Sequence, residues 1–218
     1  DAMKQGFDPI LLSAGDNFLP SPEFDASLES GTFYDAKAIN LLRYDAVAIG
    51  NHDFDMGPVV LAEFIEQANE DNPFTEPRLI PFLSANLDYT GSPELSRLIE
   101  KNMVASSSIV FTGQNTIGVI GATTENLPFI SSPGAVTVKD VAESVSAEVA
   151  KLEAAGVDAI ILVSHLQGIQ EDSLLATQSK GIDIYIAGGG DDLLANTDDL
   201  LLPGDVAKSP YPMVVTDM

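Results

Sequence analysis

Short apolar runs alternate with longer amphipathic stretches along most of this sequence. Each apolar run is too short to cross a membrane and is bounded by turn residues, which is typical of buried strands. We therefore predict strands at residues 10–13, 45–50, 79–87, 107–112, 116–122, 157–164, 182–187 and 212–218. Helical spacing of apolar side chains predicts helices at residues 34–44, 58–69, 138–155 and 170–179.

Strands that alternate with long helices favour parallel pairing, because the helix returns the chain to the same edge of the sheet. Gly113, Gln114 and Asn115 predict a hairpin between two of the strands, and Gly156 should end the helix that precedes it. Pro81 cannot donate a ladder hydrogen bond, so its strand should lie at an edge or contain a bulge. We see no internal repeat and no linker, so the pattern predicts one α/β domain, residues 1–218, with two packed sheets and helices outside.

The chain is strongly acidic, with 10 Lys and Arg against 33 Asp and Glu and a net charge of −23. This balance argues against binding to a nucleic-acid backbone, and most acidic side chains should form a solvated surface. An anionic substrate would be repelled unless cations were bound locally, so a phosphate-handling site in this chain should hold metal ions. The sequence contains no cysteine, which excludes disulfides and thiolate metal ligands.

The first residue is Asp1 and no signal peptide is visible, so we expect the chain to be truncated at both ends. Strong acidity without cysteine favours a periplasmic, secreted or cell-surface location. No apolar run is long enough for a membrane-spanning segment.

Polar residues that directly follow the apolar runs are the candidates for chemistry, since ligands of α/β sheets bind beyond the carboxyl ends of strands. These residues are Asp16, Asn17, Asn51, His52, Asp53, Asp55, Ser164, His165, Asp191 and Asp192. Both histidines of the chain are among them. Carboxylate, amide and imidazole groups together suit divalent cations such as Zn²⁺ or Mn²⁺, and one carboxylate, for which Asp16 is the natural candidate, can bridge two cations.

The strongest signal lies in residues 50–55. Asn51 and His52 are adjacent, so one side chain can face a metal while the other faces a substrate. Asp55 lies three residues after His52, close enough to orient its ring and to favour the protonated form. A protonated His52 could stabilise a transition state or protonate a leaving oxygen. The alternative for Asp53 and Asp55 is an N-cap for the helix that Pro58 opens.

Gly188, Gly189 and Gly190 leave two interpretations open. They do not form a nucleotide-binding phosphate loop, because no Gly-Lys-Ser or Gly-Lys-Thr follows them. They either make a sharp turn after a strand or let the backbone approach a metal-bound ligand closely.

These elements resemble the calcineurin-like metallophosphoesterases, and within that family the catalytic domain of the 5′-nucleotidases. The resemblance is carried by Gly15-Asp16, Gly50-Asn51-His52-Asp53, Asp55, residues 82–86, residues 117–123, Ser164-His165 and residues 182–191. The Gly-Asn-His-Asp element is specific, whereas Gly-Asp alone would be weak. The resemblance implies a four-layer α/β/β/α sandwich around two divalent metal ions, here lacking an N-terminal strand and a C-terminal part.

The resemblance also implies a role for each candidate residue. Asp16 would bridge the two metals, and Asn51 and His165 would bind the second one. His52 and Asp55 would form the catalytic dyad, and Asn17, Asn51 and His52 would contact the substrate. A metal-bound hydroxide would then attack the phosphorus of a small phosphate monoester such as a nucleotide.

Two departures from the family pattern affect the metal site. The first motif of the family, Asp-x-His, has no counterpart before Asp16, so we expect its strand to be missing from this chain. The last motif, Gly-His-x-His, aligns with residues 188–191, so that Gly189 and Asp191 replace the two histidines. Asp191 would remain an oxygen ligand, with Asp192 as the alternative. Losing imidazoles favours Mn²⁺, Mg²⁺ or Ca²⁺ over Zn²⁺, and it leaves open a non-catalytic binding or scaffold domain.

Overall fold

The computed structural model describes residues 8–73 and 76–215. Its strands are β1 (Leu12–Ser13), β2 (Ala46–Ala48), β3 (Phe82–Leu83), β4 (Leu87–Asp88), β5 (Val104–Ala105), β6 (Ser107–Thr112), β7 (Asn115–Thr123), β8 (Thr137–Val138), β9 (Ala159–His165) and β10 (Ile184–Gly188). Its helices are α1 (Pro22–Ser30), α2 (Tyr34–Leu42), the 3₁₀ turn η2 (His52–Phe54), α3 (Gly57–Ala68), α4 (Pro93–Glu100), α5 (Leu127–Ile130), α6 (Val141–Ala155) and α7 (Ile169–Gln178).

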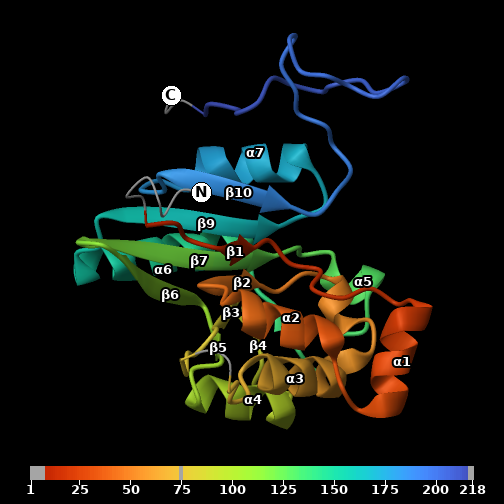
Figure 1. The fold of residues 1–218 in the computed structure, drawn as a ribbon. Coiled ribbons are helices and arrows are strands. Elements are labelled where there is room, and N and C mark those ends of the chain that lie inside the picture. Colours follow the sequence, from red (N-terminus) through yellow and green to blue (C-terminus); the bar gives the residue numbers. More distant parts are fainter. Residues whose placement is uncertain (1–7, 74–75, 216–218) are drawn as a thin grey trace.

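The strands form two four-stranded sheets and one short pair (Figure 1). The first sheet has the order β1-β2-β3-β5 and is parallel throughout. The second has the order β10-β9-β7-β6, in which only β6 runs antiparallel to its neighbour. The predicted hairpin is confirmed, and because Thr112 pairs with Asn115 its loop consists of Gly113 and Gln114.

Three hydrophobic cores separate four layers of structure. One core, which includes Phe64 and Phe82, lies between the first sheet and the helices α1 to α4. A second core, with Ala48 and Val163, fills the space between the two sheets. A third, with Leu152, lies between the second sheet and the helices α6 and α7. This arrangement confirms the α/β/β/α sandwich that the resemblance implies.

The alternation of side chains along the central strands builds these layers. In β9, Ile160 and Leu162 face the helical core, whereas Ile161 and Val163 face the other sheet. Both faces of the strand are therefore buried, which explains why the strand forms a continuous apolar run in the sequence.

The boundaries of α6 follow capping chemistry. Its N-cap is Asp140, whose carboxylate accepts the N–H of Glu143 at 2.8 Å. Its end at Gly156, which has a φ of 76°, confirms the predicted stop. The helix begins later than predicted because residues 137–138 form β8 instead.

The helices α1, α4 and the short α5 were not predicted from the sequence, and α1 and α4 begin in the same way. Each follows a serine whose hydroxyl accepts a backbone N–H of the first turn, from Phe24 to Ser21 and from Leu95 to Ser92. Each serine is followed by Pro and Glu, a combination that is favourable at a helix start and could have revealed both helices.

The predicted strand at residues 79–87 is two short strands, β3 and β4, and the prediction of an edge position for it was wrong. β3 lies between β2 and β5. Pro81 precedes the paired residues and contributes only its carbonyl, which accepts the N–H of Val47 at 3.0 Å. A proline at this position therefore removes no donor that the sheet uses.

Residues after β10 run as an extended segment that leaves the layers (Figure 1). Within it, Leu194 and Ser209 form an isolated bridge. The predicted strand at residues 212–218 was wrong for residues 213–215, which form no strand, and residues 216–218 lie outside the described ranges. The prediction of one domain truncated at both ends stays a prediction. No helix in the described ranges is long and apolar enough to cross a membrane.

Candidate functional site

The loops that follow β1, β2, β9 and β10 meet at one edge of the sandwich. A Cβ atom on Gly15 would lie 2.4 Å from Nδ1 of His165 and 2.9 Å from the backbone nitrogen of Gly50. A Cβ atom on Gly188 would lie 2.4 Å from the carbonyl oxygen of Ala14. Glycine thus permits close packing of four strand ends, and this packing brings the predicted side chains together.

Asp16 and His165 form the centre of this site. Nδ1 of His165 lies 2.6 Å from the carbonyl oxygen of Ala14, which can only accept, so Nδ1 carries the proton. Nε2 of the same ring lies 3.1 Å from Oδ2 of Asp16 but is buried without a hydrogen-bond partner. When the ring is neutral, Nε2 of His165 and Oδ2 of Asp16 are therefore two acceptors that face each other. This contact is favourable when the ring is protonated or when both atoms bind one cation.

Asp16 is held in place by its surroundings. Its φ of 52° lies in the left-handed region, and its Oδ1 accepts the N–H of His52 at 2.8 Å. A Cβ atom on Gly50 would lie 2.3 Å from the same oxygen. Burial raises the pKa of Asp16, but the contact with His165 and the N–H of His52 outweigh burial and hold the pKa below its ordinary value. Asp16 is therefore ionised at neutral pH.

His52 and Asp55 pair within and just after the turn η2. Nδ1 of His52 lies 2.5 Å from Oδ2 of Asp55, and Oδ1 of Asp55 accepts the hydroxyl of Ser131 at 2.8 Å. The hydrogen bond to Asp55 raises the pKa of His52, although partial burial opposes this. The His52 side chain is 41% exposed, so its Nε2 is the ring nitrogen left for a ligand.

The structure contradicts the alternative that Asp53 or Asp55 caps the start of α3. The N-cap of α3 is Met56, and no side chain caps this helix end. Asp55 instead pairs with His52. Asp53 is completely buried and accepts the backbone N–H groups of Asn17 and Gly50.

Asn17 and Asp53 tie the loops after β1 and β2 together. Asn17 donates both side-chain N–H groups, to Asp53 at 2.9 Å and to the carbonyl of Ala48 at 3.1 Å, and its oxygen accepts from Ser13. Asp53 also accepts the backbone N–H groups of Asn17 and Gly50, each at 2.8 Å. Complete burial raises the pKa of Asp53 to about 7. The role of Asn17 in substrate binding stays a prediction, while its contacts give it a structural role.

Asn51 is buried next to the histidine loop. Its Oδ1 accepts the side-chain N–H of Gln167 at 3.0 Å, and its exposed fraction is 5%. An amide oxygen has two lone pairs, so a second one remains for a cation.

Gly189 lies against His165. A Cβ atom at this position would lie 3.2 Å from Nε2 of His165 and 2.1 Å from the carbonyl oxygen of Leu166, and its φ is 76°. The glycines therefore make a left-handed turn and also bring the backbone close to a candidate ligand. Asp191 is exposed, and within the described ranges it does not complete a three-residue cluster with Asp16 and His165. Its role as a ligand stays a prediction.

Asp192, the alternative ligand, has partners away from the site centre. One of its oxygens accepts the N–H of Ile169 at 3.1 Å, at the start of α7. The other pairs with Lys208. These contacts connect the segment after β10 to α7.

No family model matches the chain. The 5′-nucleotidase of Rattus norvegicus is 32% identical over 217 residues, covering 95% of this chain and 33% of that protein. The crystal structure of a 5′-nucleotidase precursor from Thermus thermophilus has a TM-score of 0.80 and 33% identity, covering 96% of this chain and 37% of that one. A calcineurin-like phosphoesterase from Bacillus subtilis shares the fold, with a TM-score of 0.61 and 24% identity over 82% of this chain and 57% of that one.

The chain belongs to the 5′-nucleotidase-type metallophosphoesterases. It spans about a third of the length of the 5′-nucleotidases that it matches. The shared fold agrees with the resemblance drawn from the motifs after each strand.

The residues of this 5′-nucleotidase-type domain fit a divalent cation at Asp16 and His165. The buried, unpartnered Nε2 of His165 facing an ionised carboxylate is the observation that supports this fit. Asn51 adds an amide oxygen. In the part of the chain that the structure describes, no group of three or more His, Asp or Glu side chains is arranged to hold a metal ion, so the donor set consists of Asp16, His165 and an amide.

Sequence reasoning missed two residues of the 5′-nucleotidase-type site. Gln167 follows the same strand as His165, so the rule of polar residues after strands could have found it. Ser131 lies 76 residues after its partner Asp55 and carries no motif in the sequence.

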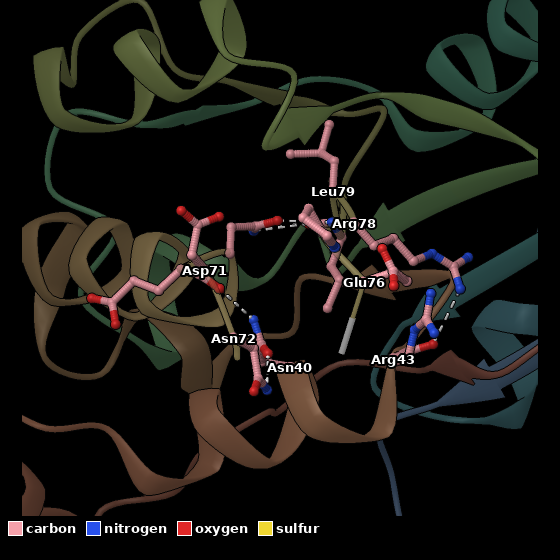
Figure 2. A pocket seen from close by; sticks show the side chains of 11 residues that line it. Asn40, Arg43, Asp71, Asn72, Glu76, Arg78 and Leu79 are labelled. Carbon is pink, nitrogen blue, oxygen red and sulfur yellow. Dashed lines mark hydrogen bonds between the residues drawn. The ribbon is translucent and has the colours of Figure 1, made fainter. Parts of the chain in front are cut away.

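A cavity of about 290 Å³ lies away from this site in the 5′-nucleotidase-type domain (Figure 2). It is formed by the last turn of α2 and by residues after α2, after α3 and before β3, at the amino end of that strand. Its polar groups bind one another: Asn72 donates to Asn40 at 2.7 Å, and Arg78 to the carbonyl of Arg43 at 3.5 Å. None of the predicted site residues lines it.

Proposed function

We propose that the full-length protein hydrolyses phosphate monoesters of the nucleotide type with the help of divalent cations. The observation that carries this proposal is the meeting of Asp16 and His165 with the His52–Asp55 pair at one edge of the sandwich. Relatives named 5′-nucleotidase, at 32% and 33% identity, support a nucleotide as the substrate.

The side chains of the site would have two roles: three of them would hold a cation, and His52 would donate a proton. Asp16, His165 and Asn51 would hold a cation, which when bound supplies Lewis-acid activation of water and of the phosphoryl oxygens. His52 keeps the proton on Nδ1 directed at Asp55, so its Nε2 faces outward. The raised pKa of His52 favours a second proton on Nε2, which the ring could donate to a phosphoryl or leaving oxygen.

The metal preference should follow the donor atoms. Gly189 supplies no side chain, and Asp191, if it binds, would offer only oxygen where the family has imidazole. We therefore expect Mn²⁺, Mg²⁺ or Ca²⁺ to support activity better than Zn²⁺. A competition titration in which Zn²⁺ binds tightest would contradict this preference.

The test uses full-length protein stripped with EDTA and then supplied with Mn²⁺. Turnover of p-nitrophenyl phosphate and of AMP should depend on the added cation, with AMP preferred over glycerol phosphate. His52→Ala should lower kcat by roughly 100- to 10,000-fold, since it removes an acid catalyst. Asp198→Asn, an exposed position, serves as the matched control and should leave kcat unchanged.

The altered glycine turn supports a second candidate, a non-catalytic binding or scaffold domain. Under that alternative, the wild-type protein and His52→Ala would turn over p-nitrophenyl phosphate at equal rates, and these rates would not depend on added Mn²⁺. Such a result would overturn hydrolysis as the function while leaving the fold assignment intact.

The location is part of the same proposal. The acidic, cysteine-free composition supports a periplasmic, secreted or cell-surface protein. Fractionation of the producing cells with an antibody should recover the protein outside the cytoplasm. Recovery from the cytoplasm alone would contradict this.

A further inference from the structure

We propose that Ser131 is a positioning residue of this site, whose hydroxyl holds Asp55 so that Asp55 holds the His52 ring toward the substrate. The inference rests on the proposed function for its effect on turnover. Its structural part, the orientation of the ring, stands on the geometry alone.

The carboxylate of Asp55 is held at both of its oxygens. Oδ1 accepts the hydroxyl of Ser131 at 2.8 Å, and Oδ2 lies 2.5 Å from Nδ1 of His52. A carboxylate bound at only one oxygen can turn about its side-chain bonds, whereas one bound at both has a fixed plane. Because 41% of the His52 side chain is exposed, packing constrains its ring little and Asp55 must orient it.

Ser131 reaches the dyad from the connection that follows the second sheet's β7 in the chain. His52 and Asp55 follow β2 of the first sheet, whereas Ser131 directly follows α5, which comes after β7 of the second sheet. In Figure 1, α5 lies beyond the end of the sandwich to which β9 and β10 point. The hydrogen bond therefore joins the loop after β2 to the connection that leaves β7 of the second sheet.

The segment that carries Ser131 is firmly attached. Leu127, the first residue of α5, is completely buried in the core beneath the first sheet. The N–H of Ser131 donates to the carbonyl of Leu127 at 3.1 Å. The hydroxyl is thus presented from a fixed backbone, as a positioning group requires.

The neighbouring residue supplies a matched control. Ser132 is exposed, whereas Ser131 is half-buried against Asp55. Ser131→Ala and Ser132→Ala remove the same atom from adjacent residues, so a general effect on folding can be separated from an effect on the dyad.

The kinetic test measures kcat and KM of the metal-loaded full-length protein with p-nitrophenyl phosphate. Ser131→Ala should lower kcat roughly 10- to 100-fold, because a misplaced catalytic group loses its alignment. KM should change little, Ser131→Thr should restore most of kcat, and Ser132→Ala should match the wild type. Equal values for Ser131→Ala and Ser132→Ala would overturn the proposal.

A double-variant cycle separates positioning from a purely structural role. If Ser131 acts through Asp55, adding Ser131→Ala to Asp55→Asn should cause no further loss of kcat. If Ser131 acts by stabilising the fold, the two losses should multiply, and the proposal would fail.

A spectroscopic test does not depend on activity, so it distinguishes failure of this inference from failure of the proposed function. In metal-free protein, at a pH where the ring is neutral, the ¹⁵N shifts of His52 report which nitrogen carries the proton; His52→Gln identifies its signals. The wild type and Ser132→Ala should keep the proton on Nδ1, and Ser131→Ala should move part of it to Nε2. An unchanged tautomer in Ser131→Ala would refute the proposal even if the wild type is active, and a wild type without turnover would refute only the enzymatic function.

Discussion

At the scale of residues, two aspartates of the site differ in environment and therefore in role. Asp16 has its pKa held low by His165 and by the N–H of His52 despite burial, so it is charged and available to a cation. Asp53 is completely buried, its pKa is about 7, and its oxygens accept from Asn17 and Gly50. The first is suited to bind a ligand and the second to hold two loops in register.

Replacing Asp53 by asparagine should destabilise the protein. A carboxyl group offers two acceptor oxygens to the three N–H groups around it, whereas an amide offers one oxygen and turns a donor toward a donor. We expect Asp53→Asn to lower the free energy of unfolding by about 1–3 kcal/mol, as for other buried groups left unsatisfied. Urea unfolding of the EDTA-treated protein measures this, with Asp198→Asn as the exposed control.

The same variant should change the dependence of stability on pH. Because the pKa of Asp53 is raised to about 7 in the folded state from 3.8, its contribution to stability is present below the ordinary pKa and is lost as pH rises toward about 7. Wild-type protein should therefore lose stability across this window, and Asp53→Asn should lose less. If the free energies of unfolding of the two proteins change with pH in parallel, Asp53 is ionised across the whole window and the prediction is wrong.

The residues of the site were only partly predictable from sequence. Asp16, His52 and His165 could be found because parallel strands end at a common edge, so residues that follow strands become neighbours. Ser131 could not be found, since its contact with Asp55 depends on how α5 packs. Local spacing carries no information on such a contact.

At the scale of elements, the two sheets approach each other so closely that β7 needs glycine. A Cβ atom on Gly121 would lie 2.2 Å from the backbone oxygen of Leu83 in β3. A Cβ atom on Gly118, in the same strand, would lie 2.7 Å from the tip of the Leu152 side chain in α6. A side chain can move aside, but the backbone of a paired strand cannot.

We therefore expect different costs from the same substitution in one strand. Gly121→Ala should lower the free energy of unfolding by about 3 kcal/mol or more, because it overpacks against backbone. Gly118→Ala should cost about 1 kcal/mol, because Leu152 can adopt another rotamer. Chemical unfolding of both variants measures the difference, and equal costs would contradict the proposed rigidity of the contact between the sheets.

Element prediction succeeded where the hydrophobic pattern spans many residues and failed where elements are short. The alternation in β9 and the glycine stop of α6 were visible in the sequence. β3 was misplaced because Pro81 suggests an edge, although the proline lies one residue before the pairing begins. Two-residue strands such as β3 take their position from neighbouring strands rather than from their own composition.

At the scale of the whole molecule, the net charge of −23 works against binding any anion. Divalent cations at Asp16 and His165 would reverse this locally, so the proposed hydrolysis and the binding of an anionic substrate would use the same ions. Stability should then depend on metal and on pH together.

Cation binding and protonation compete for Nε2 of His165. Burial lowers the pKa of His165, but the contacts with Asp16 and with the carbonyl of Ala14 outweigh burial and raise it, which favours a proton on Nε2 in the metal-free protein. The stability from this raised pKa is present below about 6.5 and is lost as pH rises through the folded value. A cation needs the same lone pair and must displace the proton, so the increase in Tm caused by Mn²⁺ should grow between about pH 6 and pH 8.

Thermal unfolding with and without Mn²⁺ measures this increase. The ionic strength must be matched, because the acidic surface also responds to screening. In His165→Gln the Mn²⁺ effect should be small at both pH values; an equal shift at both pH values in the wild type, or a shift retained in His165→Gln, would place the cation elsewhere.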